Sequence, residues 1–265
     1  MKLELKDLSF GYDESRMILR DVSFTLDGGG VFCILGQNGT GKSTLLKCIV
    51  GEEKASGQVL VDGKDYARYS QRELAKKIAY LPQNHVPTFP FRVLDVVLMG
   101  RSAHMRYFAS PGEAEERIAM GNLEFLGIAH LREQPYTNIS GGERQLVMIA
   151  AALTQQPEFL ILDEPTAHLD FGNTHRFLDL LLRLNESGIG ILMTTHFPDQ
   201  ALYLGAKTLV LRGGSLWKFG PASEVVDEEG MSELYGLPVH IGQVGDRRVC
   251  IAGEIKGDIN GQYRT

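Results

Sequence analysis

The chain has 265 residues, of which 43% are hydrophobic and 23% are charged, a composition typical of globular proteins. Its formal net charge of −6 argues against broad contact with nucleic acid, so we expect no nucleic-acid partner. The three cysteines lie far apart and form no Cys-x-x-Cys pair, so they suggest neither a disulfide framework nor a zinc site. No apolar run approaches the ~18 residues of a membrane span, and the chain start alternates like a strand rather than resembling an export signal.

The first third of the chain predicts strands that lead into a helix through a glycine-rich turn. Apolar runs and polar–apolar alternation predict strands at 2–10, 22–26, 31–35, 58–61 and 78–81. Helical patterns occupy 42–50 and 70–77. The segment 31–50 is therefore a strand–loop–helix unit.

The middle of the chain changes character after the proline-bounded segment HVPTFPF. Helical patterns follow at 93–99, 112–126 and 143–155, without a convincing strand. We therefore expect an inserted helical subdomain.

The last third returns to alternating strands and helices. Strands are expected at 159–162, 189–194 and 208–211, and an amphipathic helix at 173–185. This alternation predicts an α/β core whose mostly parallel sheet is covered on both faces. Beyond Leu237 no pattern predicts an element, and the tail KGDINGQYRT is expected to be mobile.

The clearest chemical signal is GQNGTGKS, from Gly36 to Ser43, which matches G-x-x-x-x-G-K-[ST] between a strand and a helix. Backbone N–H groups from Gly39 to Thr44 would form a nest around a β-phosphate. Lys42 would neutralise β- and γ-oxygens, and Ser43 would offer a hydroxyl to Mg²⁺. The chain is therefore expected to bind a nucleoside triphosphate.

A second signal is FLILDEP, an apolar strand that ends in two carboxylates. Asp163, at the strand end, is expected to hold Mg²⁺ through water. Glu164, one residue later, can polarise an attacking water. The pair indicates hydrolysis rather than binding alone.

A third signal is NISGGERQL, where a strong helix begins with two glycines. Ser140 and Glu143 have the spacing of a capping box. Gly141 and Gly142 would let an anion approach the unpaired N–H groups at the helix start. The stretch is either a plain cap or a phosphate site.

The order of these three signals resembles that of ATP-binding cassette (ABC) ATPases, and the resemblance extends to about Leu237. It implies a P-loop NTPase fold with a RecA-like parallel sheet core, an N-terminal antiparallel β subdomain and an inserted helical subdomain. The implied domain is 1–237, with the core and β subdomain at 1–86 and 156–237 and the helices at 87–155. Residues 238–265 would be an extension of unknown role.

The resemblance also implies ATP as substrate, Mg²⁺ as cofactor and a set of site residues. Tyr12 matches the aromatic residue that stacks on adenine, and Glu164 matches the catalytic glutamate. Gln83 matches the Q-loop residue that senses Mg²⁺ and the attacking water, and His196 matches the switch histidine at the γ-phosphate. The phosphate loop corresponds to the residues Gly36, Asn38, Gly39, Thr40, Gly41, Lys42, Ser43 and Thr44.

In this family the signature helix closes over the ATP of a second cassette in a head-to-tail dimer with two ATP. Ser140, Gly141 and Gly142 would therefore act on the ATP of a second copy of the chain, as would Asp170 in the D-loop. Two positions depart from the usual signature: Ile139 replaces Leu, and Glu143 replaces Gln. His168 replaces the Ala that is common in the D-loop.

The run FRVLDVVLMGRSAH, at 91–104, looks like that of importer ATPases for iron chelates, haem, cobalamin and molybdate or tungstate. It implies a polytopic membrane permease as partner, with a substrate-binding protein involved indirectly, and a location at the cytoplasmic face of the membrane. Residues 84–106 would line the groove for the permease, although they could also only cover the core. Two alternatives stay open: a soluble ABC ATPase of an assembly system, such as that for iron–sulfur clusters, and an exporter subunit.

Overall fold

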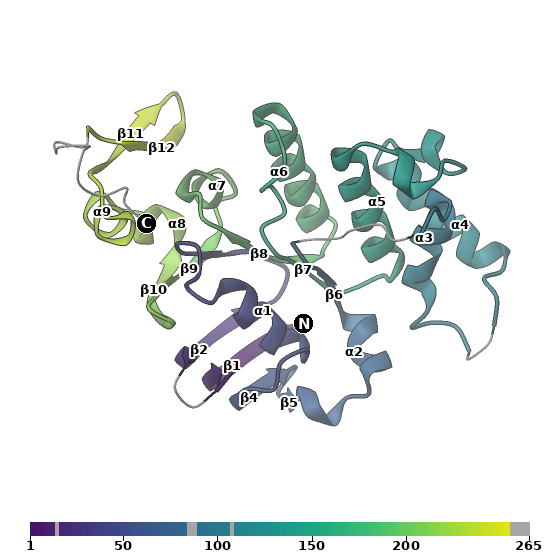
Figure 1. Cartoon of the computed structure of the whole chain (residues 1–265), viewed down its shortest axis with the longest axis horizontal. Helices are drawn as coiled ribbons and strands as arrows, with labels where there is room; N and C mark the ends of the chain where they lie inside the picture. Colours follow the sequence, from purple (N-terminus) through teal and green to yellow (C-terminus); the bar gives the residue numbers. More distant parts are fainter. Residues whose placement is uncertain (14–15, 84–88, 107–108, 255–265) are drawn as a thin grey trace.

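A computed structural model describes residues 1–13, 16–83, 89–106 and 109–254 of the chain. Its centre is a six-stranded sheet in the order β10-β9-β3-β8-β7-β6 (Figure 1). The strands are β3 (Val31–Leu35), β6 (Ile78–Leu81), β7 (Phe159–Leu162), β8 (Gly190–Thr195), β9 (Lys207–Arg212) and β10 (Ser215–Pro221). Five of them run parallel, and β10 pairs antiparallel with β9. The predicted parallel core is confirmed, but β10 was not predicted.

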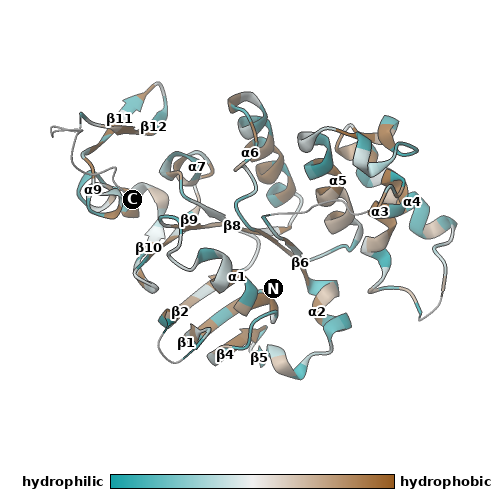
Figure 2. Cartoon of the chain, in the orientation of Figure 1, coloured by the Kyte–Doolittle hydropathy of each residue, from teal (hydrophilic) through white to brown (hydrophobic). Residues whose placement is uncertain are grey.

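Both faces of this sheet are buried, as its near-continuous apolar strands predict. Cys33 and Leu35 of β3 point into one apolar cluster, while Phe32 and Ile34 point into the other. The first cluster includes residues of α6 (Phe171–Glu186). In Figure 2 the core strands are coloured mostly hydrophobic, whereas the helices carry both hydrophobic and hydrophilic colours.

The other cluster lies between the core sheet and a four-stranded antiparallel sheet in the order β2-β1-β4-β5, with α1 (Lys42–Val50) between the two sheets (Figure 1). The strands are β1 (Lys2–Gly11), β2 (Met17–Asp27), β4 (Ser56–Val61) and β5 (Lys64–Asp65). The predicted N-terminal antiparallel sheet is confirmed. A short turn of 3-10 helix (Tyr66–Arg68) and α2 (Gln71–Lys77) lead from β5 to β6.

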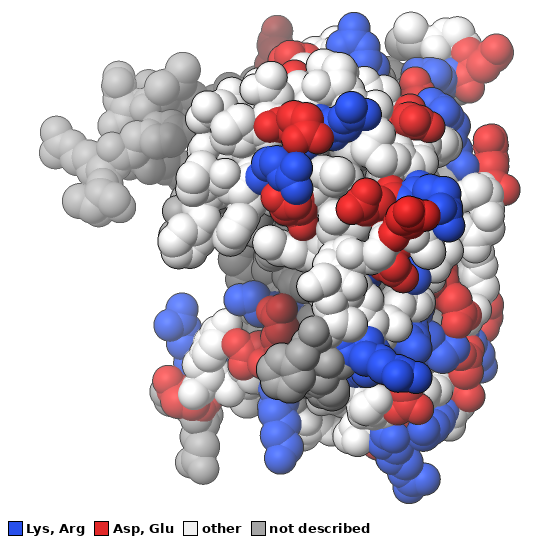
Figure 3. Space-filling model, turned by 90° about the vertical axis from the view of Figure 1, so that its right-hand side faces the viewer, with Lys and Arg blue, Asp and Glu red and all other residues white. Residues whose placement is uncertain are grey.

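The middle segment is helical and has an apolar cluster of its own, around Val97, Leu123 and Val147. Its helices are α3 (Val93–Leu98), α4 (Glu113–Phe125) and α5 (Gly141–Thr154). Short 3-10 turns lie at Met99–Arg101, Ala129–Leu131 and Tyr136–Asn138. In Figure 3, which views the molecule from this end, acidic and basic side chains are interspersed. The three predicted helices are confirmed within two residues at each end, and the domain limits at 87, 155 and 237 stay a prediction.

The C-terminal part contains elements that no sequence pattern had led us to expect. After α7 (Pro198–Tyr203) and α8 (Ala222–Val225) come α9 (Glu228–Tyr235) and a hairpin of β11 (Val239–Val244) and β12 (Arg247–Ala252). The hairpin has a usable signal that was missed, because Gly245-Asp246 is a turn pair between runs containing valine and isoleucine. The tail 256–265, expected to be mobile, lies outside the described residues.

No helix within the described ranges is long and apolar enough to cross a membrane.

Candidate functional site

The phosphate loop joins β3 to α1, and its glycines are required by close packing and by backbone conformation. A Cβ atom on Gly36 would lie 2.8 Å from the carbonyl oxygen of Leu211 and 2.8 Å from the hydroxyl of Thr40. Gly41, just before α1, has a φ of 97°, in the left-handed region that favours glycine. The loop therefore turns sharply and delivers Lys42 at the first position of the helix.

The Lys42 ammonium group is buried and surrounded by oxygen atoms. It donates hydrogen bonds to the carbonyls of Gly36, at 2.9 Å, and Gln37, at 3.0 Å. It also lies 3.1 Å from Oε1 of Glu164. The carboxylate of Glu164 already pairs with this ammonium group, so another anionic ligand can bind the group in its place.

Asp163 connects the phosphate loop to the neighbouring strand. Its Oδ1 accepts hydrogen bonds from the hydroxyls of Ser43, at 3.0 Å, and Thr194, at 2.7 Å. The Thr194 hydroxyl also accepts a bond from the backbone N–H of Glu164, at 2.7 Å. Thr194 was not among the predicted site residues. The local signal was the pair Thr194-Thr195 at the end of an otherwise apolar strand, just before a predicted site histidine, and this signal does not indicate a bond to Asp163.

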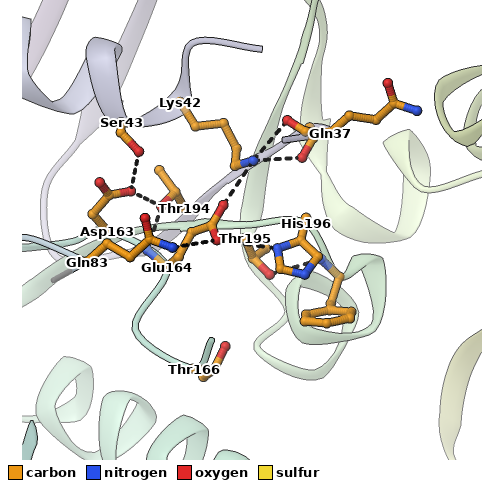
Figure 4. A network of polar contacts seen from close by, with 12 residues as sticks. Gln37, Lys42, Ser43, Gln83, Asp163, Glu164, Thr166, Thr194, Thr195 and His196 are labelled. Carbon is orange, nitrogen blue, oxygen red and sulfur yellow. Dashed lines mark hydrogen bonds and ion pairs between the residues drawn. The ribbon is translucent and has the colours of Figure 1, made fainter. Parts of the chain in front are cut away.

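Glu164 is the point at which the predicted catalytic residues meet (Figure 4). Its Oε2 accepts a hydrogen bond from the side-chain amide of Gln83, at 3.2 Å, and lies 3.5 Å from Nδ1 of His196. With Lys42 on Oε1, the carboxylate thus has contacts from three separate segments of the chain. Glu164 also has a φ of 43°, in the left-handed region that residues with side chains rarely adopt.

The oxygen atoms around Asp163 fit a magnesium site. Among the residues that the structure describes, no group of three or more His, Cys, Asp or Glu side chains could hold a metal ion. Mg²⁺ in nucleotide sites needs no such group, since it is held by one or two protein oxygens together with phosphates and water. Ser43 and Asp163, 3.0 Å apart, supply a hydroxyl and a carboxylate of this kind.

The signature stretch forms the capping box that its spacing predicts. The Oε2 atom of Glu143 accepts hydrogen bonds from the backbone N–H of Ser140, at 2.8 Å, and from its hydroxyl, at 2.7 Å. These bonds hold the pKa of Glu143 below its usual value, so the carboxylate is ionised. Ser140 is exposed, as is Gly141, and both stand at the positive end of α5.

The remaining predicted residues lie outside the cluster around Glu164. Tyr12 follows β1 and is 56% exposed, with its ring 5.1 Å from that of Phe10, edge to face. Asp170 is exposed and caps α6 by accepting a hydrogen bond from the N–H of Asn173, at 2.7 Å. This capping was not predicted.

A pocket of about 390 Å³ lies between α5 and the segment that follows β7. Gln83 and Glu164 line it, together with Gly141 and His168. The side-chain amide of Gln145, on α5, donates a hydrogen bond to the carbonyl of Pro165 across this pocket. A hydrogen bond therefore joins the signature helix, α5, to Pro165, the residue after Glu164.

Residues 19–167 match a family model described as ABC transporter. An uncharacterised ABC transporter ATP-binding protein of Haemophilus influenzae is 40% identical over 236 residues, which cover 89% of each chain. The molybdate import ATP-binding protein MolC of the same organism is 35% identical over 238 residues, again 89% of each chain. The iron(3+)-hydroxamate import ATP-binding protein FhuC of Bacillus subtilis is 34% identical over 241 residues, covering 90% of this chain and 89% of its own.

A solved structure extends the similarity to three dimensions. One chain of a metal-chelate type ABC transporter, in an inward-facing conformation, superposes with a TM-score of 0.83 at 32% identity. The match covers 95% of this chain and 97% of that one. It therefore includes the C-terminal elements as well as the nucleotide-binding core.

Proposed function

The chain is a member of the ABC transporter ATPase family, and on that basis we propose that it is the ATP-hydrolysing subunit of a membrane importer. The observation that carries the hydrolytic part is the convergence of Lys42, Gln83 and His196 on the carboxylate of Glu164. The importer part is supported by relatives named for molybdate and iron(3+)-hydroxamate import.

ATP binds with its phosphates on the loop from Gly36 to Thr44. The buried ammonium group of Lys42 binds β- and γ-phosphate oxygens, which compete with Glu164 for this cation. The exposed ring of Tyr12 stacks on adenine. Asn38, Gly39, Thr40 and Gly41 form the turn whose N–H groups face the phosphates.

The hydroxyl of Ser43 and the carboxylate of Asp163 would hold Mg²⁺, and Gln83, which donates a hydrogen bond to the neighbouring Glu164, would sense it. When bound, Mg²⁺ would neutralise the negative charge that develops on the phosphates during hydrolysis. Thr194 fixes the orientation of Asp163, because the Thr194 hydroxyl and the Ser43 hydroxyl donate hydrogen bonds to the same carboxylate oxygen.

Glu164 is the general base. Once phosphate oxygens bind the ammonium group of Lys42, the Glu164 carboxylate is free to accept a proton from the attacking water. Gln83 orients that water, since its amide already touches Glu164. His196, which lies against the same carboxylate oxygen as Gln83, contacts the γ-phosphate.

Two copies of the chain form a head-to-tail dimer with two ATP. Ser140 and Gly141 are exposed and Gly142 is half-exposed at the start of α5, where the Ser140 hydroxyl and the N–H groups of the two glycines can complete the γ-phosphate site of the second copy. The exposed carboxylate of Asp170 contacts the same partner. The ionised Glu143 holds the Ser140 hydroxyl, so that hydroxyl must turn away from Glu143 to reach a phosphate.

The membrane partner is a polytopic permease that docks on the helical part at the cytoplasmic face of the membrane. Two aromatic side chains, Phe89 and Phe91, are 62% and 47% exposed there. A pocket of about 420 Å³ in the same helical part is lined by Met99, Met105 and Arg106, among other residues. Of the predicted groove residues 84–106, residues 84–88 lie outside the described ranges. The transported substrate is a metal chelate, with an oxyanion such as molybdate as the second candidate.

The in-trans role of the signature predicts the behaviour of the Ser140→Arg variant. It should bind ATP like the wild type, because its own phosphate loop is intact, and hydrolyse it about 100-fold more slowly, as when a transition-state donor is lost. The matched control is Ser70→Arg, since Ser70 caps α2 with the same bonds to Glu73, at 2.8 and 2.7 Å. Ser70→Arg loses the corresponding cap of α2 but should hydrolyse ATP at the wild-type rate.

Mixed dimers test the head-to-tail arrangement through a gain of ATPase activity rather than a loss. A dimer of one Ser140→Arg chain and one Lys42→Ala chain has one site in which an intact phosphate loop faces an intact signature. ATPase activity should therefore recover on mixing the two inactive proteins. Full activity of the Ser140→Arg homodimer, or no recovery on mixing, would contradict the head-to-tail dimer.

The importer assignment is tested by purifying the chain from its native membranes in mild detergent and identifying its partners by mass spectrometry. A polytopic permease, with or without a substrate-binding protein, is the expected result. Soluble partners alone would favour an assembly ATPase, such as one for iron–sulfur clusters. They would leave the proposed ATP chemistry unaffected.

A further inference from the structure

The backbone of His196 is not held by the core sheet. The last parallel pair of β8 joins Thr195 to Leu35, so His196 is the first residue beyond the strand. Its imidazole lies 3.5 Å from Oε2 of Glu164 and rests against the ring of Phe197, at 4.0 Å between ring centroids. The position of this ring relative to Glu164 therefore depends on what fixes the bend at His196.

One such contact comes from the C-terminal part of the chain, 39 residues away. The hydroxyl of Tyr235, the last residue of α9, donates a hydrogen bond to the backbone carbonyl of His196, at 2.9 Å. Burial raises the pKa of Tyr235, so the hydroxyl keeps its proton and remains a donor. The aromatic ring is half-buried and packs on the main apolar cluster.

The C-terminal hairpin holds the helix that follows His196. The backbone N–H of Cys250, in β12, donates a hydrogen bond to Asp199 of α7, at 2.6 Å. The guanidinium of Arg247 lies 4.3 Å from the centre of the Tyr203 ring, at the other end of α7. In Figure 1 the hairpin and α9 lie on the side of the molecule next to α7. The bend at His196 thus lies between the end of β8 and a helix that the C-terminal part fixes.

We propose that Tyr235 is a positioning residue for ATP hydrolysis, and that α9 and the C-terminal hairpin hold the His196 imidazole in register with Glu164. The effect passes through the backbone carbonyl of His196, since Tyr235 touches neither the reacting atoms nor Glu164 itself. This inference rests on the proposed role of His196 at the γ-phosphate. It also gives a function to part of the extension 238–265.

The test is the Tyr235→Phe variant of the whole chain, which removes one hydroxyl and keeps the ring. We expect kcat for ATP hydrolysis to fall between about 2- and 10-fold, as for loss of one hydrogen bond, with KM for ATP unchanged. The matched control is Tyr69→Phe, because the Tyr69 hydroxyl also donates to a backbone carbonyl, that of Val61, at 2.9 Å. This control should leave kcat unchanged.

Two further readouts separate positioning from a loss of stability. In a His196→Ala background, Tyr235→Phe should cause no additional loss of kcat, because the residue that it positions is gone. The NMR signals of the His196 ring should shift in Tyr235→Phe and not in Tyr69→Phe. This second readout does not depend on turnover.

The failures of the two proposals are distinguishable. A wild-type chain that does not hydrolyse ATP would overturn the proposed function, and the positioning role with it. If the wild type hydrolyses ATP and His196→Ala does so more slowly, then unchanged kcat and unchanged His196 signals in Tyr235→Phe would overturn the positioning role alone.

Discussion

Replacing Glu164 with Gln should lower the rate of ATP hydrolysis by about 100-fold or more, because the amide cannot accept a proton from water. ATP binding should be retained. Glutamine has nearly the same shape, and its neutral amide no longer competes with phosphate for Lys42, which lies 3.1 Å from the carboxylate. Two measurements check this: phosphate release at steady state, and the population of dimer in the presence of ATP, which should rise because the bound nucleotide is not consumed.

The control for this variant is Glu158→Gln. The two glutamates flank the same strand, β7, and each pairs with a lysine, Glu158 with Lys77 at 2.7 Å. Loss of the Glu158 charge should change hydrolysis by less than two-fold, since exposed ion pairs contribute little. If Glu164→Gln retained turnover at the level of this control, Glu164 would not be the base.

Replacing Lys42 with Ala should weaken ATP binding by about 10- to 100-fold, the effect of losing a charge-assisted hydrogen bond to phosphate. The loss has a second cause, because the Glu164 carboxylate is then left without its cation and repels the γ-phosphate. Titration calorimetry with ATP and Mg²⁺ measures the affinity. Thermal unfolding of the same sample shows whether the variant is folded.

Lys77→Ala is the matched control, since Lys77 also pairs with carboxylates, Asp62 at 3.0 Å and Glu158 at 2.7 Å. These pairs lie at the amino end of β6 and β7, away from the phosphate loop. ATP affinity should be unchanged in this variant. Equal affinities for Lys42→Ala and the wild type would refute the phosphate-loop assignment.

The sequence predicted the parts of this molecule whose signal is local. The phosphate loop could be recognised because its glycines, Lys42 and Ser43 are adjacent in sequence and must be adjacent in space. Most helices and core strands could be predicted for the same reason, since their apolar periodicity repeats within a few residues. The antiparallel sheet, by contrast, was expected from the family resemblance and not from its own residues.

The parts that could not be predicted depend on contacts between distant residues. The hydroxyls of Ser43 and Thr194 both donate to Oδ1 of Asp163, which lies 120 positions from Ser43 and 31 from Thr194, and the local pattern around Thr194 does not identify this partner. The hydrogen bond from the Tyr235 hydroxyl to the His196 carbonyl likewise joins distant residues, 39 positions apart. β10 was missed because its residues are all partly exposed and give no strong apolar run.

The left-handed backbone at Glu164 places this residue in a conflict between folding and function. A residue with a side chain costs about 1–3 kcal/mol in such a conformation, out of a total folding free energy of about 5–15 kcal/mol. Glycine would adopt the same φ of 43° without this cost, but it has no carboxylate. Selection for the fold alone would therefore favour glycine here. If Glu164 is the base, as we propose, conformational stability has been given up to hold this acid in place.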